Sequence, residues 1–236
     1  MKKTVFFDLD GTLLPMNQDL FGKVYFETLA ARMERHGYDS NALMDAVWKG
    51  TMDMVANDGS RTNEEVFWAS FCDSMGERCR DDEPLFADYY RNEFQQVAEV
   101  CGRTEKAAAT VRLCKELGAD VVLATSPLFP RIATESRIRW AGLDRADFLH
   151  VTTYEDYNFC KPNPNYYRQI LQRLDLRAED CLMVGNDAVE DGAAAKLGIP
   201  LFLLTDCLIN KAGVDINAFP CGGFEELQTW LREQLN

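Results

Sequence analysis

The chain has 236 residues, of which 47% are hydrophobic and 27% charged, a balance typical of a globular protein with one α/β domain and a smaller lobe. Its formal net charge of −13 offers little basic surface for nucleic acid or anionic lipid, so we expect neither nucleic acid nor a membrane as a partner. No apolar run reaches the length of a transmembrane helix, and Asp8 and Asp10 interrupt the first apolar run too early for a signal peptide.

The cysteines bear on metal binding and on the compartment. Eight of them are spread along the chain without a C-x-x-C pair, and there are only two histidines. This pattern disfavours a zinc site. Dispersed cysteines are typical of reduced thiols, so we expect a cytoplasmic protein. Nothing in the sequence indicates an oligomeric state.

The first predicted element is a buried strand over residues 4–8, which runs directly into the sequence D-L-D-G-T at 8–12. Residues two apart at a strand end face the same side, so Asp8 and Asp10 can point into one site. Gly11 lets the chain turn there. Two carboxylates this close need a cation, and oxygen ligands favour Mg²⁺ over Zn²⁺. The alternative is an ordinary turn after a strand, which also favours Asp and Gly.

Residues 17–100 contain no convincing strand. Their apolar positions recur at three- and four-residue spacing, which is typical of helices. Three such faces are Leu20, Val24 and Tyr25; Val66, Phe67, Ser70 and Phe71; and Phe86, Tyr89, Tyr90 and Phe94. The pattern predicts an all-helical cap domain, inserted after the first strand and lying over the strand ends.

From about residue 101 onward, short apolar runs alternate with amphipathic stretches. Together with the first strand, the predicted strands are residues 4–8, 120–125, 148–152, 181–185 and 200–204. This alternation predicts an α/β fold built from parallel β-α-β units, whose ligands bind at the carboxyl ends of the strands. We therefore expect a core domain of residues 1–16 and 101–236 and a helical cap domain of residues 17–100.

A second group of polar residues, Thr125 and Ser126, follows the predicted strand at 120–125. A hydroxyl and neighbouring backbone N–H groups at such a position can hold a phosphate oxygen. A strand exit or a helix cap explains the same residues without a ligand.

A third group is Lys161-Pro162-Asn163-Pro164, just before a predicted helix. Asn163 suits an N-cap and Pro164 the first helical turn. Lys161 then lies in a loop at the site edge of the sheet, where its ammonium can neutralise an anion. A solvated surface lysine is the ordinary alternative.

The fourth group is the strand exit from Gly185 to Asp191. We expect Asp187 to reach a metal held by Asp8, and Asp191 to assist the metal or orient Lys161. Acidic residues also favour helix N-termini for electrostatic reasons alone. Each of the four groups has an ordinary structural explanation, but their order along a parallel sheet matches the parts of a phosphoryl-transfer site.

With these motifs, the chain resembles the haloacid dehalogenase-like hydrolase superfamily over nearly its whole length. The resemblance rests on D-L-D-G-T at 8–12, Thr125-Ser126 after a hydrophobic strand, Lys161-Pro162, and G-N-D-x-x-x-D ending at Asp191. It implies a Rossmann-like core with strand order 5-4-1-2-3 and a helical cap inserted after the first motif.

The resemblance also implies roles for individual residues. Asp8 would attack phosphorus and become an aspartyl-phosphate, while Asp10 would protonate the leaving oxygen and then activate water. Asp8, the Asp10 carbonyl and Asp187 would bind Mg²⁺, with Asp191 assisting.

Thr125, the Ser126 N–H and Lys161 would hold the phosphate. Family members often carry Gly-Asp where this chain has Gly185-Asn186, and a shifted register would place Asn186 at the ligand position instead of Asp187.

The favoured function is a Mg²⁺-dependent phosphatase of a small phosphorylated metabolite. A dehalogenase would not need Asp10 as an acid, and a phosphonatase would need a cap lysine in a recognisable motif. A sugar phosphomutase, a dehalogenase and a non-catalytic binding protein, all of the same fold, remain alternatives. Four residues of the predicted cap are candidates for facing the substrate: Trp48, Lys49, Arg61 and Trp68.

Overall fold

The computed structural model describes residues 2–236, so Met1, the first residue of the predicted core domain, lies outside the described residues. Its strands form one parallel sheet in the order β3-β2-β1-β4-β5-β6. The strands are β1 (Thr4–Phe7), β2 (Asp120–Leu123), β3 (His150–Val151), β4 (Cys181–Gly185), β5 (Leu201–Leu204) and β6 (Cys221–Gly222). Read from the other edge, the first five have the implied order 5-4-1-2-3, and β6 is an additional short strand beside β5. The predicted α/β fold is confirmed.

Helices fill most of the remaining chain. The α-helices are α1 (Gln18–Glu34), α2 (Ser40–Val55), α3 (Asn63–Met75), α4 (Glu83–Arg91), α5 (Glu105–Glu116), α6 (Arg131–Trp140), α7 (Pro164–Arg173) and α8 (Phe224–Leu235). Short 3₁₀ helices are η1 (Glu77–Arg80), η2 (Glu93–Val100), η3 (Arg145–Asp147), η4 (Ala178–Asp180), η5 (Asp191–Leu197) and η6 (Ile216–Ala218).

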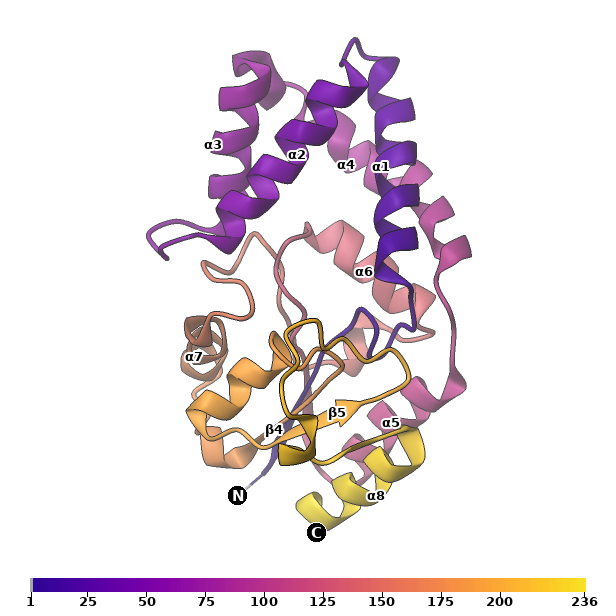
Figure 1. Ribbon diagram of the computed structural model, residues 1–236, viewed down its shortest axis with the longest axis vertical. Helices are drawn as coiled ribbons and strands as arrows, with labels where there is room; N and C mark the ends of the chain where they lie inside the picture. The colour runs from indigo at the N-terminus through magenta and orange to yellow at the C-terminus, as the bar shows by residue number, and fades with distance from the viewer. Residues whose placement is uncertain (1) are drawn as a thin grey trace.

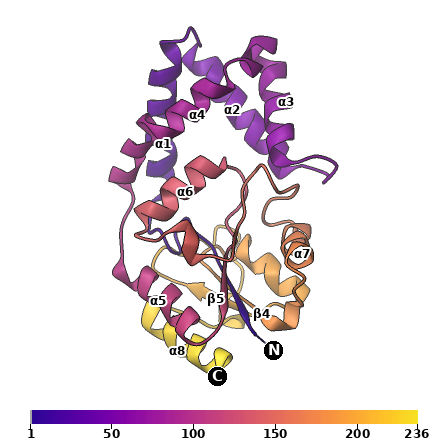
Figure 2. The same ribbon diagram turned by 180° about the vertical axis from the view of Figure 1, so that it is seen from behind.

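Alternation along the buried strands builds two layers of core, one on each face of the sheet. In β1, Val5 and Phe7 belong to a cluster that includes residues of α5 and α8. Phe6, between them, belongs to a cluster that includes residues of α7 and η5. Because neighbouring strand residues point to opposite faces, helices cover both sides of the sheet, as the two opposite views show (Figures 1 and 2).

The helices from α1 to η2 form a separate block, which stands at one end of the molecule beyond the carboxyl ends of the strands (Figure 1). No described residue of 17–100 lies in a strand, as predicted. The chain enters and leaves this block side by side, because Met16 pairs with Cys101 and the Gly102 N–H donates to the Pro15 carbonyl at 2.6 Å. An aromatic-rich core holds the block together and extends onto α6 through Ala133 and Trp140.

The expectation that all cysteines are reduced is wrong for one pair. Cys72, near the end of α3, and Cys79, in η1, form a disulfide. The backbone turns sharply between them at Gly76, whose φ of +88° suits glycine, and this turn brings the two side chains together. The other cysteines are free: Cys101, Cys114, Cys160, Cys181, Cys207 and Cys221.

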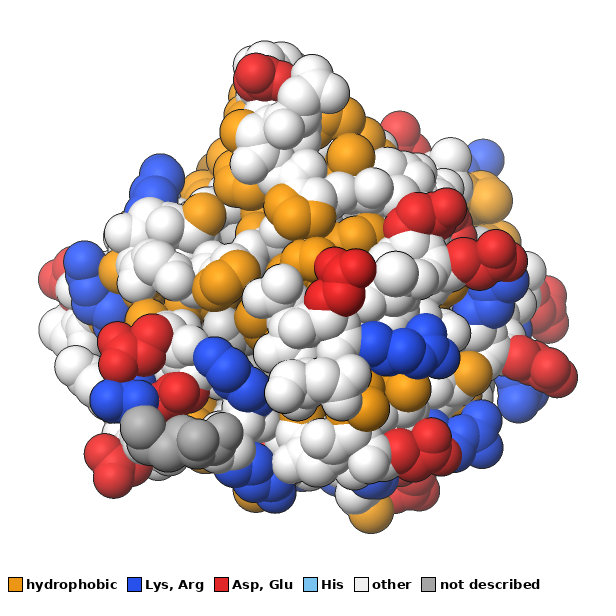
Figure 3. Space-filling model, turned by 90° about the horizontal axis from the view of Figure 1, so that it is seen from below, with side chains coloured by type: hydrophobic (Ala, Val, Ile, Leu, Met, Phe, Trp, Pro, Cys, Tyr) orange, Lys and Arg blue, Asp and Glu red, His pale blue; other side chains and the backbone are white. Residues whose placement is uncertain are grey.

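Two surface features bear on possible partners. No helix among residues 2–236 combines the length and the apolar character needed to cross a membrane. On the end of the molecule remote from the helical block, basic and acidic side chains are intermixed rather than gathered by sign (Figure 3).

Candidate active site

The predicted site residues meet at one edge of the sheet because the central strands run parallel and in register. Phe7 of β1 pairs with Leu123 of β2 and with Val184 of β4. The residues that follow each strand therefore emerge together, beneath the helical block. A cavity of about 690 Å³ lies at this edge, and six predicted site residues line it: Asp8, Asp10, Thr125, Ser126, Asp187 and Asp191.

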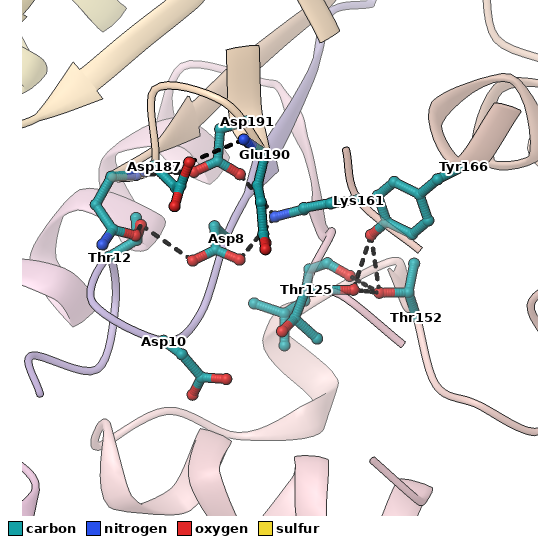
Figure 4. A network of polar contacts seen from close by, with 12 residues as sticks. Asp8, Asp10, Thr12, Thr125, Thr152, Lys161, Tyr166, Asp187, Glu190 and Asp191 are labelled. Carbon is teal, nitrogen blue, oxygen red and sulfur yellow. Dashed lines mark hydrogen bonds and ion pairs between the residues drawn. The ribbon is translucent and has the colours of Figure 1, made fainter. Parts of the chain in front are cut away.

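Lys161, the remaining predicted residue, joins two of these carboxylates. Its Nζ lies 2.7 Å from Asp8 Oδ1 and 2.7 Å from Asp191 Oδ1 (Figure 4). Asn163 caps α7 as predicted, accepting a hydrogen bond from the Asn165 N–H, so the loop that carries Lys161 ends at a fixed point. The lysine is 2% exposed and belongs to the site, not to the solvated surface.

This buried ion-pair network keeps the lysine charged. Burial by itself lowers the pKa of Lys161, but the Asp191 and Asp8 carboxylates outweigh it and hold the pKa well above its usual value. Lys161 is thus a permanent positive charge beside Asp8, inside a chain whose net charge is −13.

Asp191 is fixed through both carboxylate oxygens. Its Oδ1 accepts from Lys161, and its Oδ2 accepts from the backbone N–H groups of Asn186 and Asp187, each at 2.9 Å. Burial raises the pKa of Asp191 to about 6, while Lys161 and the backbone donors oppose that rise. Asp191 therefore holds Lys161 in place beside Asp8, and its expected role in assisting the metal stays a prediction.

Gly185 makes the position of Asp191 possible. A Cβ at residue 185 would lie 2.0 Å from Asp191 Oδ2 and 2.6 Å from Asp191 Cβ. We expect Gly185→Ala to displace Asp191, to lower the free energy of unfolding by about 1–3 kcal/mol, and to reduce turnover. Urea unfolding and steady-state kinetics would measure both effects. Gly192→Ala is the matched control, since nothing lies within 4 Å of a Cβ there; equal effects of the two substitutions would contradict this role for Gly185.

Asn186, which directly follows β4, is fixed by side-chain hydrogen bonds on both sides. It is 1% exposed, its Nδ2 donates to the Cys207 carbonyl at 2.8 Å, and its Oδ1 accepts from the Thr12 hydroxyl at 2.9 Å. The same Thr12 hydroxyl lies 3.3 Å from Asp8 Oδ2. Gly11, with a φ of +91°, lies directly against Asn186, where a Cβ would come within 2.3 Å of Nδ2. The turn after β1 therefore packs directly on the turn after β4: Gly11 leaves room for the Asn186 side chain, and Thr12 donates a hydrogen bond to it.

Asp187 lies at the cavity wall, in the loop between β4 and η5, the helix that begins at Asp191. Its Oδ1 accepts hydrogen bonds from the N–H groups of Val189 at 2.8 Å and Glu190 at 2.9 Å. In Figure 4 the Asp187 carboxylate lies on the side of this loop that faces Asp8. The metal-ligand role of Asp187, and the register chosen over Asn186, stay predictions.

Asp10 has a partner that the sequence analysis missed. A guanidinium nitrogen of Arg137, in α6, forms an ion pair with Asp10 Oδ2. The arginine is 1% exposed, donates to the Thr134 hydroxyl at 3.2 Å and stacks over the Phe129 ring at 4.4 Å. The other oxygen of Asp10, Oδ1, is buried without a hydrogen-bond partner among the described residues. Arg137 therefore fixes Asp10 through Oδ2 and leaves Oδ1 unpaired among the described residues.

Thr125 and Ser126 line the cavity in a loop whose backbone is fixed by two buried hydroxyl groups. The Thr125 carbonyl accepts from the Thr152 hydroxyl at 2.6 Å and from the Tyr166 hydroxyl at 2.9 Å (Figure 4). Neither Thr152 nor Tyr166 was predicted as part of the site. Their hydrogen bonds fix the backbone at the end of β2, which is where a phosphate oxygen was expected to bind.

Glu190 is a second ionisable residue that sequence reasoning missed. It lines the cavity beside Asp187 and Asp191. Burial raises its pKa to about 7, Lys161 lowers it, and the carboxylates of Asp191, Asp187 and Asp8 raise it further. An acidic residue at a helix start is so common that its position alone carried no signal.

The polar atoms around Asp8 bear on metal binding. Among the described residues, no group of three or more His, Cys, Asp or Glu side chains is arranged as a metal site. Mg²⁺ typically takes one or two protein carboxylates and completes its shell with waters and substrate oxygens. Asp8 and Asp187 offer such carboxylates, and the Asp10 carbonyl accepts no backbone hydrogen bond within residues 2–236. This all-oxygen donor set fits Mg²⁺.

Comparisons with known proteins place the chain in a family. Residues 2–198 match the model of the haloacid dehalogenase-like hydrolases. The chain is 25% identical to pyrophosphatase PpaX of Bacillus cereus over 185 residues, which are 78% of this chain and 74% of that protein. It is also 23% identical to haloacid dehalogenase-like hydrolase domain-containing protein 3 of Danio rerio over 220 residues, 90% of this chain and 88% of that one.

Among solved structures, a predicted phosphatase from Clostridium acetobutylicum aligns with a TM-score of 0.60 at 16% identity, covering 99% of both chains. Identity this low shows a shared fold and nothing finer. The family match over residues 2–198 goes further, because it spans all four motif regions that meet around the cavity. The chain is a haloacid dehalogenase-like hydrolase and hence an enzyme.

Proposed function

We propose that this enzyme is a Mg²⁺-dependent phosphatase of a small phosphorylated metabolite. The observation that carries the proposal is the placement of Asp8: it lines the cavity, its Oδ1 pairs with buried Lys161, and Asp10 lines the same cavity two residues away. Such a pair offers a carboxylate nucleophile and a separate acid–base group at one position.

In the first step, an oxygen of Asp8 attacks phosphorus and the bond from phosphorus to the leaving oxygen breaks. Asp10 gives its proton to that oxygen, and the alcohol leaves. In the second step, water attacks the phosphorus of the aspartyl-phosphate, and Asp10 accepts the water proton. Inorganic phosphate leaves, and the Asp8 carboxylate and protonated Asp10 are restored for the next turnover.

The remaining residues manage charge and position. Lys161 balances the negative charge of the phosphate, and the Thr125 hydroxyl and Ser126 N–H bind its oxygens. Asp8, the Asp10 carbonyl and Asp187 would hold Mg²⁺, with Asp191 assisting. Bound there, the ion would reduce repulsion between nucleophile and phosphate; two like charges 4 Å apart repel by about 4 kcal/mol at an effective dielectric constant of 20.

We further propose that the helical block of residues 17–100 is a cap domain over the core of residues 1–16 and 101–236. The support is that residues of α1, α2, α3 and α4 line the same cavity as the motif residues. A cap in this position would exclude bulk water during the first step.

Arg137 gives this mechanism a testable pH dependence. Burial raises the pKa of Asp10, Arg137 opposes that rise, and Asp8 adds to it. The first step needs protonated Asp10 and the second needs it ionised, so the rate of the second step falls as the pH drops through this pKa and gives the profile its acidic limb. Arg137→Met removes the opposing charge and raises the pKa further, and we expect the acidic limb of the kcat–pH profile to move to higher pH.

Two further variants separate charge from packing. Arg137→Lys keeps the positive charge and should leave the acidic limb closer to its wild-type position than Arg137→Met does. Arg139→Met, at an exposed position of the same helix, should leave it unchanged. If Arg137→Met folds and its acidic limb stays in place, Arg137 does not control the protonation of Asp10.

The proposal is tested by following inorganic phosphate released from 4-nitrophenyl phosphate by the purified enzyme. Release with Mg²⁺ that stops on addition of EDTA and returns with excess Mg²⁺ would support it. No release under any metal condition would overturn it. Incubation with a sugar phosphate distinguishes a phosphomutase, which would yield an isomerised phosphate ester instead of free phosphate.

A further inference from the structure

The upper part of the cavity differs in character from the catalytic end. Above Asp8 and Asp10, the walls come from the helical block, from the segment between β2 and α6, from the beginning of α6 and from the segment after β3. Large apolar side chains dominate there, among them Phe21, Phe26, Phe67, Trp68, Phe129 and Tyr154. Of the four candidates for facing the substrate, Trp48 and Trp68 line the cavity and the cations Lys49 and Arg61 do not.

The charges in this upper part are mainly negative. Four carboxylates line it: Glu64, Glu83, Glu135 and Glu155. The lining contains two guanidinium groups, those of Arg91 and Arg131. The Arg131 guanidinium is paired with Asp156 at 2.6 Å. Burial raises the pKa of Glu64, and the neighbouring Glu155 and Glu83 carboxylates raise it further, which agrees with a negative potential at this end.

Lys49, a cation of the helical block, does not add positive charge to the cavity. Its Nζ lies 3.1 Å from Asp53 Oδ2 and 2.8 Å from the Ser70 hydroxyl, outside the cavity. A second phosphate or carboxylate on a substrate would therefore meet four carboxylates at the upper end, against one guanidinium, that of the exposed Arg91, with no ion-pair partner among the described residues. An uncharged aromatic or aliphatic group would meet ring faces and methylenes, which favour its burial.

Size supports the same conclusion. A cavity of about 690 Å³ lies within the range that takes a drug-sized ligand, and a phosphate or a two-carbon ester would leave most of it filled by water. An aromatic lining that stays wet contributes nothing to binding, whereas a bulky leaving group would cover it.

We propose that the preferred substrates are phosphomonoesters of a bulky, largely apolar or aromatic alcohol that carries no second anionic group. This inference rests on the proposed phosphatase function. It separates the chain from what the name of its relative PpaX says of that protein, because pyrophosphate has no apolar part and is anionic at both ends.

Three alkyl phosphates form a direct test, since each has an alkoxide leaving group: 2-phenylethyl phosphate, ethyl phosphate and 2-phosphoglycolate. With wild-type enzyme and Mg²⁺, we expect kcat/KM for 2-phenylethyl phosphate to exceed that for ethyl phosphate by about tenfold or more, from burial of the ring. We expect kcat/KM for 2-phosphoglycolate to lie below that for ethyl phosphate.

Variants connect these preferences to the cavity. Trp48 is 60% exposed, so Trp48→Ala should fold, and it should lower kcat/KM for 2-phenylethyl phosphate more than for ethyl phosphate. Glu64→Gln should raise kcat/KM for 2-phosphoglycolate relative to ethyl phosphate. Leu149→Ala and Glu99→Gln are matched controls at exposed positions outside the cavity, and both should leave every ratio unchanged.

The outcomes separate this inference from the function on which it rests. If none of the three esters is hydrolysed, and 4-nitrophenyl phosphate is not either, the phosphatase itself is refuted. If kcat/KM for ethyl phosphate and for 2-phosphoglycolate equals that for 2-phenylethyl phosphate, the phosphatase function stands and the proposed substrate class is wrong. A preference that neither Trp48→Ala nor Glu64→Gln alters would also overturn the inference, because it would not arise from this cavity.

Discussion

Asp8→Asn is expected to lower kcat for a phosphomonoester by about 10³-fold or more, with the enzyme still folded. The amide has nearly the shape of the carboxylate, but it is a poor nucleophile and carries no charge to attract the proposed Mg²⁺. Steady-state phosphate release and thermal unfolding of wild type and variant would measure the two halves of this prediction.

A control isolates the effect to this position. Asp45→Asn makes the same chemical change at an exposed residue of α2 outside the cavity, and kcat should be unaffected. Retention by the Asp8 variant of more than a few per cent of wild-type kcat would mean that Asp8 does not attack phosphorus.

Lys161→Met is expected to have the largest effect on stability. The side chain is 1% exposed and pairs with Asp8 and Asp191, themselves 11% and 1% exposed. Lys161 is the one side chain among residues 2–236 that contacts both carboxylates, and removing it leaves buried negative charge uncompensated. Breaking a buried pair in this way costs about 3–5 kcal/mol, which equilibrium urea unfolding at neutral pH would measure. Phosphate release should also be lost, because the phosphate would face two carboxylates without the ammonium.

The cost of Lys161→Met should depend on pH. In the wild type, Lys161 opposes the rise that burial causes in the pKa of Asp191. Without the lysine, the folded-state pKa of Asp191 rises further above its wild-type value of about 6. An acid whose pKa is raised by folding favours the folded state at low pH and loses that contribution as the pH rises through the folded-state pKa. The variant should therefore be less destabilised at pH 5 than at pH 8. Lys196→Met, at an exposed position, should show no such trend, and a pH-independent cost for Lys161→Met would contradict the ion-pair account.

Much of the fold could be predicted because the strands of a buried parallel sheet are short, continuous apolar runs. Each predicted strand exists, although β1 ends at Phe7 and β3 is only His150–Val151. Ends shift because pairing, not hydrophobicity, decides where a strand stops. The short strand β6 was missed because Cys221–Gly222 is too short and too exposed to show a pattern.

Helical faces were predicted less reliably within the helical block. Leu20 was expected on the buried face of its helix, but it is 43% exposed, and the buried face of α1 is formed by Phe21, Tyr25, Leu29 and Met33. Hydrophobicity alone could not choose between adjacent stripes of an apolar helix. What decides is the position of the partner helices, which the local sequence does not contain.

The predicted site residues came together because parallel strands in register bring their exits to one edge. The missed residues are those whose role depends on a contact across the fold. Arg137 is the clearest case: a charged residue on the face that α6 shares with Ala133 and Ile138, which are both fully buried. An arginine on an apolar helical face signals a buried carboxylate partner, and this pattern was available in the sequence. That the partner is Asp10 was not.

The central claim, that Asp8 forms the covalent intermediate, is tested most directly by trapping it. The enzyme would be mixed with Mg²⁺ and ³²P-labelled phosphomonoester, quenched in acid within the first turnover and counted for ³²P on the protein. A parallel sample would be reduced with tritiated borohydride, which converts the acyl phosphate to an alcohol and releases the phosphate, and its tritium-labelled peptide would be sequenced. We predict label on the peptide of β1 and reduction at Asp8. Full turnover with label on another residue, or with no label on the protein at any quench time, would contradict it.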